Sequence, residues 1–391
     1  MRKKGTLFLG MAALLLAGTG VSAAGTAPEA SFGGQYRINS YTLMDKDGAG
    51  NIAASRVRIR QNIDLKFSEE FNTHIQFNIG HITEGIGNHT ANTTGTAAPG
   101  VTVGLRHAVM KYKFSDAAIL VAGLVPLSDK FGDTLFSGDW DFNPLTYALV
   151  GNSGGFDYRV GSFTVAENGE SDETTAGGKT MNDIGGYLLD LGGDLGVAKA
   201  GVMGLIIQTP NVAADGYDSN SWFGVRADGD VTGLKWHLSG VSSSVKKNIA
   251  GTTDDATGIQ ILAKVDGKVG DLGWGVLALN SSGEKGTKKG FISPQSLYGG
   301  QGYWGKTGIL NIQGPTDTGM DANMLRTDND GLGLMTIQAN VSSPLTDNLG
   351  GYLGAGWYQA NQDNATGSKD IGSDIYAQLK YSFPNSPLAL Q

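Results

Sequence analysis

The feature that most constrains the fold is a series of short segments in which polar and apolar residues alternate. Sixteen such segments recur between residues 32 and 383. An extended strand points successive side chains to opposite faces, so each segment is predicted to be a β-strand with one apolar and one polar face. The predicted strands span residues 32–44, 55–67, 72–82, 104–114, 118–127, 144–150, 156–166, 184–191, 196–208, 221–228, 234–243, 257–268, 272–280, 332–341, 349–360 and 372–383.

The lengths of the connections alternate as well. Connections that follow even-numbered strands are short, whereas those that follow odd-numbered strands are long, up to the loop at 281–331. Aromatic residues gather near the short-turn ends, as in a belt at a membrane interface: Phe67, Phe71, Tyr112, Phe114, Phe156, Tyr158, Trp236, Trp274, Tyr381 and Phe383. This pattern predicts an all-β transmembrane antiparallel barrel of about 16 strands, with short periplasmic turns and long extracellular loops.

The N-terminus predicts export from the cytoplasm. Basic residues at positions 2–4 precede an apolar run at 7–17 and a small-x-small cleavage motif at 21–23. Residues 1–23 are therefore predicted to be a signal peptide and residues 24–391 a single barrel domain. No later stretch is apolar for long enough to form a transmembrane helix, so a membrane protein made from this chain must use strands. The expected location is the outer membrane of a Gram-negative bacterium.

The segment SRVRIRQNIDLKF at 55–67 has an unusually charged face. Charge on the lipid face is costly, so this face is predicted to line a water-filled lumen while its valine, isoleucine and leucine residues face lipid. The segment RHAVMKYKF at 106–114 adds a second basic face. Together they give the predicted pore-lining basic residues Arg56, Arg58, Arg60, Lys66, His107, Lys111 and Lys113.

The connection at 124–144 mixes four carboxylates with four aromatic residues: Asp129, Asp133, Asp139 and Asp141 with Phe131, Phe136, Trp140 and Phe142. We expect this segment to fold into the lumen as a pore-constricting loop, with its aromatic rings packed on the wall and its carboxylates facing the arginines. Opposed charges across a narrow passage would create a transverse field that orients polar solutes. An external loop that caps the barrel is the alternative.

Several classes of function are excluded or disfavoured. The chain has no cysteine, which excludes disulfides, thiolate metal sites, iron-sulfur clusters and covalent haem attachment. A formal net charge of −8 disfavours nucleic-acid binding. The motif GNSGG at 151–155 lies between two strands, so it is predicted to be a hairpin turn instead of a nucleophile elbow. DKDGAGN at 45–51 is also interpreted as a turn, and the five histidines never pair at metal-binding spacing. No catalytic residue, cofactor or metal is predicted.

Four stretches of the sequence resemble general bacterial porins, and more closely the outer-membrane porins of anaerobic metal-reducing bacteria. They are SRVRIRQNIDLKF, THIQFNIGH, LRHAVMKYKF and AGLVPLSDKFGDTLFSGDWDFNP. The resemblance implies sixteen strands, a homotrimer, an inward-folded third loop, and a basic cluster that faces acidic residues. The three arginines at 56–60 match the basic cluster, and the four aspartates at 129–141 match the acidic loop. One departure is that Phe383 is followed by PNSPLALQ, which could open a further strand and makes 18 strands possible.

The sequence thus predicts a passive diffusion channel for small hydrophilic solutes and ions, surrounded by outer-membrane lipid and lipopolysaccharide. Two other functions remain open at this point. The barrel could be the sheath of an electron conduit around a multihaem cytochrome, or it could be an outer-membrane enzyme with a catalytic site at its rim.

Overall fold

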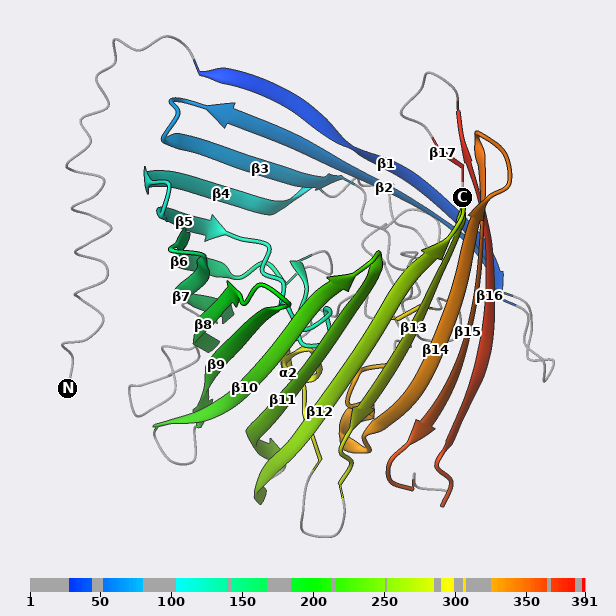
Figure 1. Ribbon diagram of the computed structural model, residues 1–391. Coiled ribbons are helices and arrows are strands. Elements are labelled where there is room, and N and C mark those ends of the chain that lie inside the picture. The colour runs from blue at the N-terminus through cyan, green and yellow to red at the C-terminus, as the bar shows by residue number, and fades with distance from the viewer. Residues whose placement is uncertain are drawn as a thin grey trace, which may run out of the picture.

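The structure is a computed structural model (Figure 1). It describes residues 28–43, 52–79, 103–138, 142–166, 184–211, 216–249, 252–284, 290–298, 305–306, 325–363, 367–383 and 389–390. The predicted signal peptide and the turn at 45–51 lie outside these residues. No helix within the described ranges is both long enough and apolar enough to cross a membrane.

All sixteen predicted strands are confirmed, with boundaries that shift by up to six residues. They are β1 (Glu29–Leu43), β2 (Ile52–Lys66), β3 (Phe71–Ile79), β4 (Val103–Ser115), β5 (Ala118–Leu124), β6 (Leu145–Ser153), β7 (Phe156–Ala166), β8 (Ile184–Asp194), β9 (Lys199–Asn211), β10 (Gly216–Val231), β11 (Leu234–Ile249), β12 (Thr252–Val269), β13 (Leu272–Ser281), β14 (Leu334–Pro344), β15 (Leu349–Ala360) and β16 (Asp370–Ser382).

Each strand pairs in antiparallel register with the next, from β1 through β16. The sheet curves around an interior, as Figure 1 shows. The protein is therefore an antiparallel β-barrel of the outer-membrane type. After Phe383 the chain returns to form the two-residue strand β17 (Ala389–Leu390), which pairs with Tyr381 and Ser382 at the end of β16.

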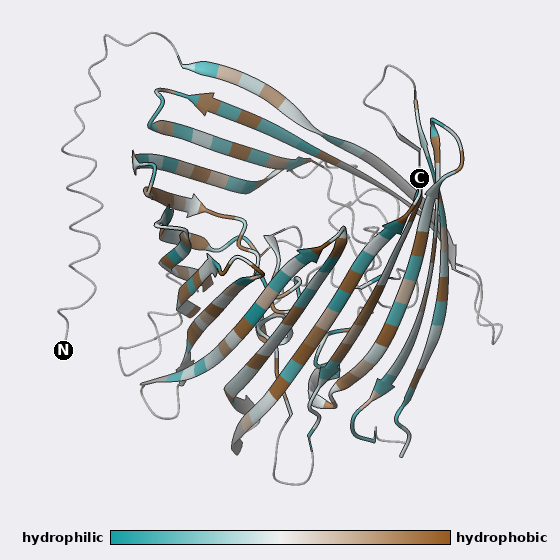
Figure 2. Ribbon diagram, in the orientation of Figure 1, coloured by the Kyte–Doolittle hydropathy of each residue, from teal (hydrophilic) through white to brown (hydrophobic). Residues whose placement is uncertain are grey.

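The strands are apolar outside and polar or packed inside, and Figure 2 shows the alternation along each of them. On β16, Ile375 and Leu379 are largely exposed, whereas their neighbours Asp374 and Tyr376 are buried. The same alternation places Ile337 of β14 outside and Gln338 inside. An outer surface of exposed isoleucine, leucine and valine is stable only against an apolar medium, as a bilayer provides.

Every connection after an even-numbered strand is short, two to four residues, at 67–70, 116–117, 154–155, 195–198, 232–233, 270–271 and 345–348. The predicted long connections after odd-numbered strands are wrong at two places, because β10, β11 and β12 extend further than predicted and leave only 212–215 after β9 and 250–251 after β11. The predicted hairpin turn at GNSGG is confirmed, because Ser153 pairs directly with Phe156 across it. Aromatic pairs with at least one exposed ring also lie at the end of the barrel where the even-numbered strands turn: Phe67 with Phe71, Tyr112 with Phe114, and Tyr381 with Phe383.

Candidate functional site

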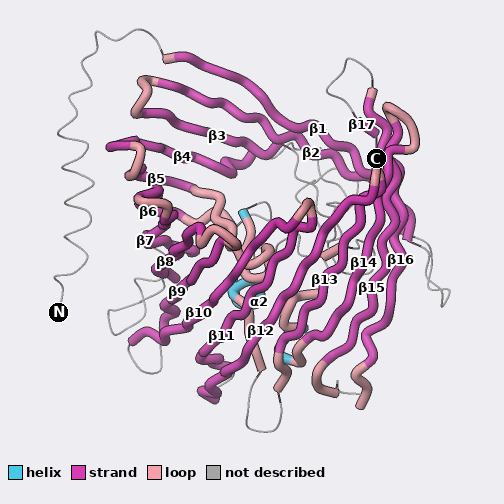
Figure 3. Tube along the Cα trace, viewed as in Figure 1, coloured by secondary structure: helices cyan, strands magenta, loops and turns pink. Residues whose placement is uncertain are grey.

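The inner loop, residues 125–144 between β5 and β6, lies inside the curved sheet (Figure 3). Its two limbs form a narrow hairpin. The backbone N–H of Val125 donates to the carbonyl of Pro144 (3.2 Å), and Leu127 donates to Phe142 (3.0 Å). Because the limbs satisfy each other's backbone groups, the loop can enter the interior without leaving them unpaired. That it forms the narrowest point of a channel stays a prediction.

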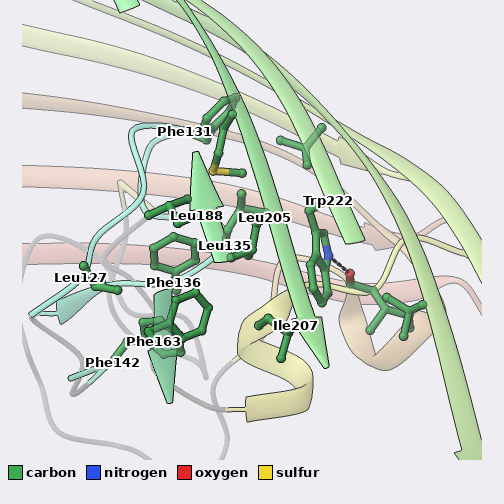
Figure 4. Close-up of a cluster of buried hydrophobic side chains, with 14 of the residues drawn as sticks. Leu127, Phe131, Leu135, Phe136, Phe142, Phe163, Leu188, Leu205, Ile207 and Trp222 are labelled. Atoms are coloured by element: carbon green, nitrogen blue, oxygen red, sulfur yellow. Dashed lines mark hydrogen bonds between the residues drawn. The ribbon is translucent and has the colours of Figure 1, made fainter. Parts of the chain in front are cut away.

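Apolar side chains of the inner loop pack against the wall that β7 to β10 form (Figure 4). Phe131, Leu135 and Phe136 are completely buried there. Gly224 of β10 makes room for the ring of Phe131, since a Cβ atom at this position would lie 2.5 Å from the ring. The wall residues of the cluster are Phe163, Leu188, Met203, Leu205, Ile207 and Trp222. This part of the barrel interior is therefore filled by packed side chains.

Asp129 holds the tip of the inner loop together. Its carboxylate accepts four backbone N–H bonds, from Phe131 (2.6 Å), Asp133 (3.0 Å), Leu135 (2.7 Å) and Phe136 (3.0 Å). The pKa of the Asp129 carboxyl is raised, because the effect of burial exceeds that of the hydrogen bonds, which lower the pKa by stabilising the charged form. The sequence analysis expected this carboxylate to face the arginines of β2. In the structure it is enclosed by the backbone of its own loop.

Replacing Asp129 by asparagine should loosen the loop. The amide would keep one acceptor oxygen but would present an NH₂ donor to two of the four N–H groups. We expect the free energy of unfolding to fall by about 2 to 3 kcal/mol, the typical effect of losing hydrogen bonds to a charged group. Thermal unfolding in detergent measures the change. The control is Asp157→Asn, because Asp157 accepts an exposed bond from Asn152; equal losses in both variants would contradict this role.

A β-bulge on β4 turns two consecutive basic side chains inward. Gln76 of β3 pairs with His107, whereas the next residue, Phe77, pairs with Leu105, so Arg106 is the extra residue. Both Arg106 and His107 are buried. Strict alternation placed Arg106 on the lipid face, and the sequence analysis therefore missed it. Its guanidinium donates to the carbonyl of Gly138 in the inner loop (2.6 Å), which ties β4 to that loop.

Asp190 of β8 is the centre of a buried charge cluster. Its carboxylate oxygens lie 3.0 Å from Arg226 of β10, 3.3 Å from Arg159 of β7 and 3.4 Å from Lys130 of the inner loop. The Asp190 side chain is only 1% exposed. Arg159 also donates to the carbonyl of Ser128 (2.9 Å). Three wall strands and the inner loop are thus held through one carboxylate.

The contact between the side chains of Arg226 and Asp190 depends on a glycine in the strand between them. Strand β9 lies between β8 and β10, and Arg226 pairs with Gly201 of β9. A Cβ atom at Gly201 would lie 2.4 Å from the Arg226 guanidinium, so only glycine lets that side chain cross β9. Sequence reasoning missed this cluster as well. The available signal was a single aspartate at an inward position among the leucines of β8.

Of the basic residues predicted on β2, Arg60 bonds to β3, next to a polar network that links β2, β3 and β4. Arg60 donates to the side chain of Asn78 (3.2 Å). Gln76 donates to Asn62 (2.7 Å) and accepts from Arg106 (2.6 Å). The strand register places positions 56 and 58 on the same face as Arg60, but the side chains of Arg56 and Arg58 lie outside the described part of the chain.

The remaining predicted site residues lie at different places in the barrel and do not form one site. Lys66 pairs with Glu69 and Lys113 pairs with Asp116, both beside short turns at the rim of the barrel. Lys111 is exposed, and the His107 ring lies 5.7 Å from the ring of His74. Asp133 interacts electrostatically with Lys264 of β12. Asp139 and Asp141 lie outside the described residues.

Parts of a second segment also fold into the interior. The long segment, residues 282–333 between β13 and β14, corresponds to the loop at 281–331 that was expected to be extracellular. In the structure the indole of Trp222 donates to the carbonyl of Ile292 (2.7 Å), and Thr327 donates to the carbonyl of Thr134 in the inner loop (2.9 Å). Asp328 is buried and accepts bonds from Ser293, before the short helix α2 (Pro294–Tyr298). The apolar residues that anchor this segment are too few to predict its placement from sequence.

No protein-family model matches the sequence, and no curated protein matches it. Several solved structures do match this chain. The crystal structure of Pseudomonas aeruginosa OpdK with vanillate is 12% identical and has a TM-score of 0.56, over 92% of this chain and 90% of that one. The outer-membrane channel DcaP of Acinetobacter baumannii is 12% identical (TM-score 0.49; 93% and 99% covered). A mutant of the Rh. blastica porin is 8% identical (TM-score 0.45; 91% and 100%). The similarity to OpdK supports the barrel fold.

Proposed function

We propose that this protein is an outer-membrane porin, a passive channel for small hydrophilic solutes and ions that acts without catalysis. The observation that carries the proposal is the two-sided character of the strands. The same strands that expose isoleucine and leucine outward turn charged side chains inward, and the buried Asp190 is paired with Arg226. An interior of this kind is suited to water and polar solutes, and the exterior is suited to lipid.

We place the permeation path along the wall formed by β1 to β4. The opposite wall is covered by the packed inner loop and by parts of the long segment. Register pairing sets Arg37 of β1 directly opposite Arg58 of β2, next to Arg60. A wall whose sequence carries several arginines has a positive potential, which attracts anions. We therefore propose that this wall attracts anionic solutes.

Swelling of proteoliposomes tests the proposed function. Vesicles that contain the purified protein should swell in isosmotic solutions of small neutral sugars, at rates that fall as the sugar becomes larger. Passive diffusion also predicts that the rate does not saturate with solute concentration. Vesicles that stay as tight as protein-free controls would overturn the proposal. The described residues offer no specific support for the cytochrome sheath or for a barrel enzyme.

We further propose that the barrel assembles as a homotrimer, as the resemblance to porins implies. The outer face of β15 carries Gly351, Leu353 and Ala355, small and apolar residues that allow close packing between barrels. Unheated electrophoresis should then show a slowly migrating band that collapses to the monomer on boiling. A single monomer mass in mild detergent would contradict this assembly.

A further inference from the structure

Lys306 belongs to the long segment, yet it is held by three strands of the barrel wall. Its ammonium pairs with Asp266 of β12. Its backbone N–H donates to the side chain of Gln338 on β14, and its carbonyl accepts from the hydroxyl of Tyr352 on β15, both at 2.5 Å. Only 17% of the Lys306 side chain is exposed. The side chain and the backbone of this residue are therefore both fixed to the wall.

These contacts lie deep in the barrel, close to the short-turn end. Asp266 is three residues before the end of β12, and Gly275, beside the ion pair, is three residues after the start of β13. The long segment leaves the wall after Ser281, at the opposite end of β13. Six residues of strand separate Ser281 from Gly275, which corresponds to about 20 Å at the usual rise of a strand. Lys306 therefore contacts the wall about 20 Å along the strands from the point where the long segment leaves it.

The wall has a space that fits the Lys306 ammonium. A Cβ atom at Gly275 would lie 2.3 Å from the Asp266 carboxylate and 2.8 Å from the Lys306 ammonium nitrogen. Any side chain at position 275 would therefore displace the ion pair. At Gly273, the preceding inward position of the same strand, a Cβ atom would meet the hydroxyl of Ser342 (2.7 Å) and no charged group.

We propose that Lys306 is an anchor that holds the long segment against the inner wall near the short-turn end, and so limits the open width of the channel at Lys306. This inference rests on the proposed channel function. A residue held only by an exposed ion pair would be anchored weakly. Here the backbone of Lys306 is bonded on both sides in addition to the ion pair, which makes it a fixed point of the segment.

The test uses a substitution that changes no charge. Gly275→Ala should displace the Lys306 ammonium, release the segment and raise the single-channel conductance above that of the wild type. Gly273→Ala is the matched control and should leave conductance unchanged. Lys306→Gln should raise conductance as well, and Asp266→Asn should do the same. A different result would overturn the anchor. In that result Lys306→Gln and Asp266→Asn shift only the ion selectivity, in opposite directions, and Gly275→Ala has no effect. Lys306 would then act only as a charge in the lumen.

A second readout does not depend on conduction. Because the chain has no cysteine, Gly305→Cys provides a single thiol next to the anchor. A water-soluble thiol reagent should label it slowly in the otherwise unchanged protein and faster when Gly275→Ala is also present. Equal labelling rates would overturn the anchor. If the protein forms no channel in the swelling assay, the proposed function fails, and the labelling rates still decide whether Lys306 holds the segment.

Discussion

Replacing Asp190 by alanine should lower the free energy of unfolding by about 3 to 5 kcal/mol, the usual effect of removing one partner from a buried ion pair. The loss would remove the carboxylate that Arg226 and Arg159 share, where Asp190 is 1% exposed, and would leave Arg226 only the more distant Asp228, 4.0 Å away. Lys130 is 43% exposed and should contribute little to the loss, because water can solvate it. Urea unfolding in lipid vesicles, followed by tryptophan fluorescence, measures the effect.

Asp228→Asn is the matched control for this prediction. Asp228 is also an inward aspartate and pairs with His237 and Arg226, but it is 44% exposed. A pair with that exposure is worth about 0 to 1 kcal/mol. The role of Asp190 as the centre of the cluster would be contradicted if both variants lost the same amount of stability.

Replacing Phe136 by alanine should have an effect of similar size. Phe136 is completely buried between the inner loop and the wall, with its ring 5.0 Å from that of Phe142. Truncating a buried phenylalanine typically costs about 3 to 5 kcal/mol, because apolar contacts are lost and a cavity remains. We expect the inner loop to detach before the barrel unfolds, so protease sensitivity within the loop should appear at lower urea than the loss of the barrel.

The control for Phe136 is Phe223→Ala, on the outer face of β10. Phe223 is 56% exposed and faces the lipid side, where acyl chains can replace the contacts that are lost. We expect this variant to lose less stability and to keep the inner loop protected from protease. Early cleavage of the loop in both variants would mean that the packing described in Figure 4 does not hold the loop in place.

The sixteen strands could be predicted because lipid imposes a strict chemical rule. An outward residue such as Ile375 must be apolar, while its neighbours Asp374 and Tyr376 are free to be polar, and this contrast repeats along every strand. The short connections after even-numbered strands follow from the same geometry, since these turns lie at one end of the barrel, whereas the short connections after β9 and β11 were not predicted. The alternation and the short turns are both local patterns, so they can be recognised in a single sequence.

The interior could be predicted only in part, because its contacts depend on register and on distant segments. Arg106 points inward through a bulge that arises from the pairing of two strands. Asp129 looked like one of four equivalent loop acids, and only the folded hairpin brings four N–H groups to its carboxylate. Lys306 reaches Asp266 across forty residues, with no periodic pattern that indicates the contact.

We propose that ions cross the barrel interior past a basic wall. The reversal potential of single channels across a salt gradient tests it most directly, in the wild type and in the variant with Arg56→Ser, Arg58→Ser and Arg60→Ser. We expect the wild type to conduct and to favour anions, and the variant to shift toward cations. Screening over about 8 to 10 Å at physiological salt should reduce this shift without abolishing it. A protein that forms no channels, or a variant with the reversal potential of the wild type, would contradict the account.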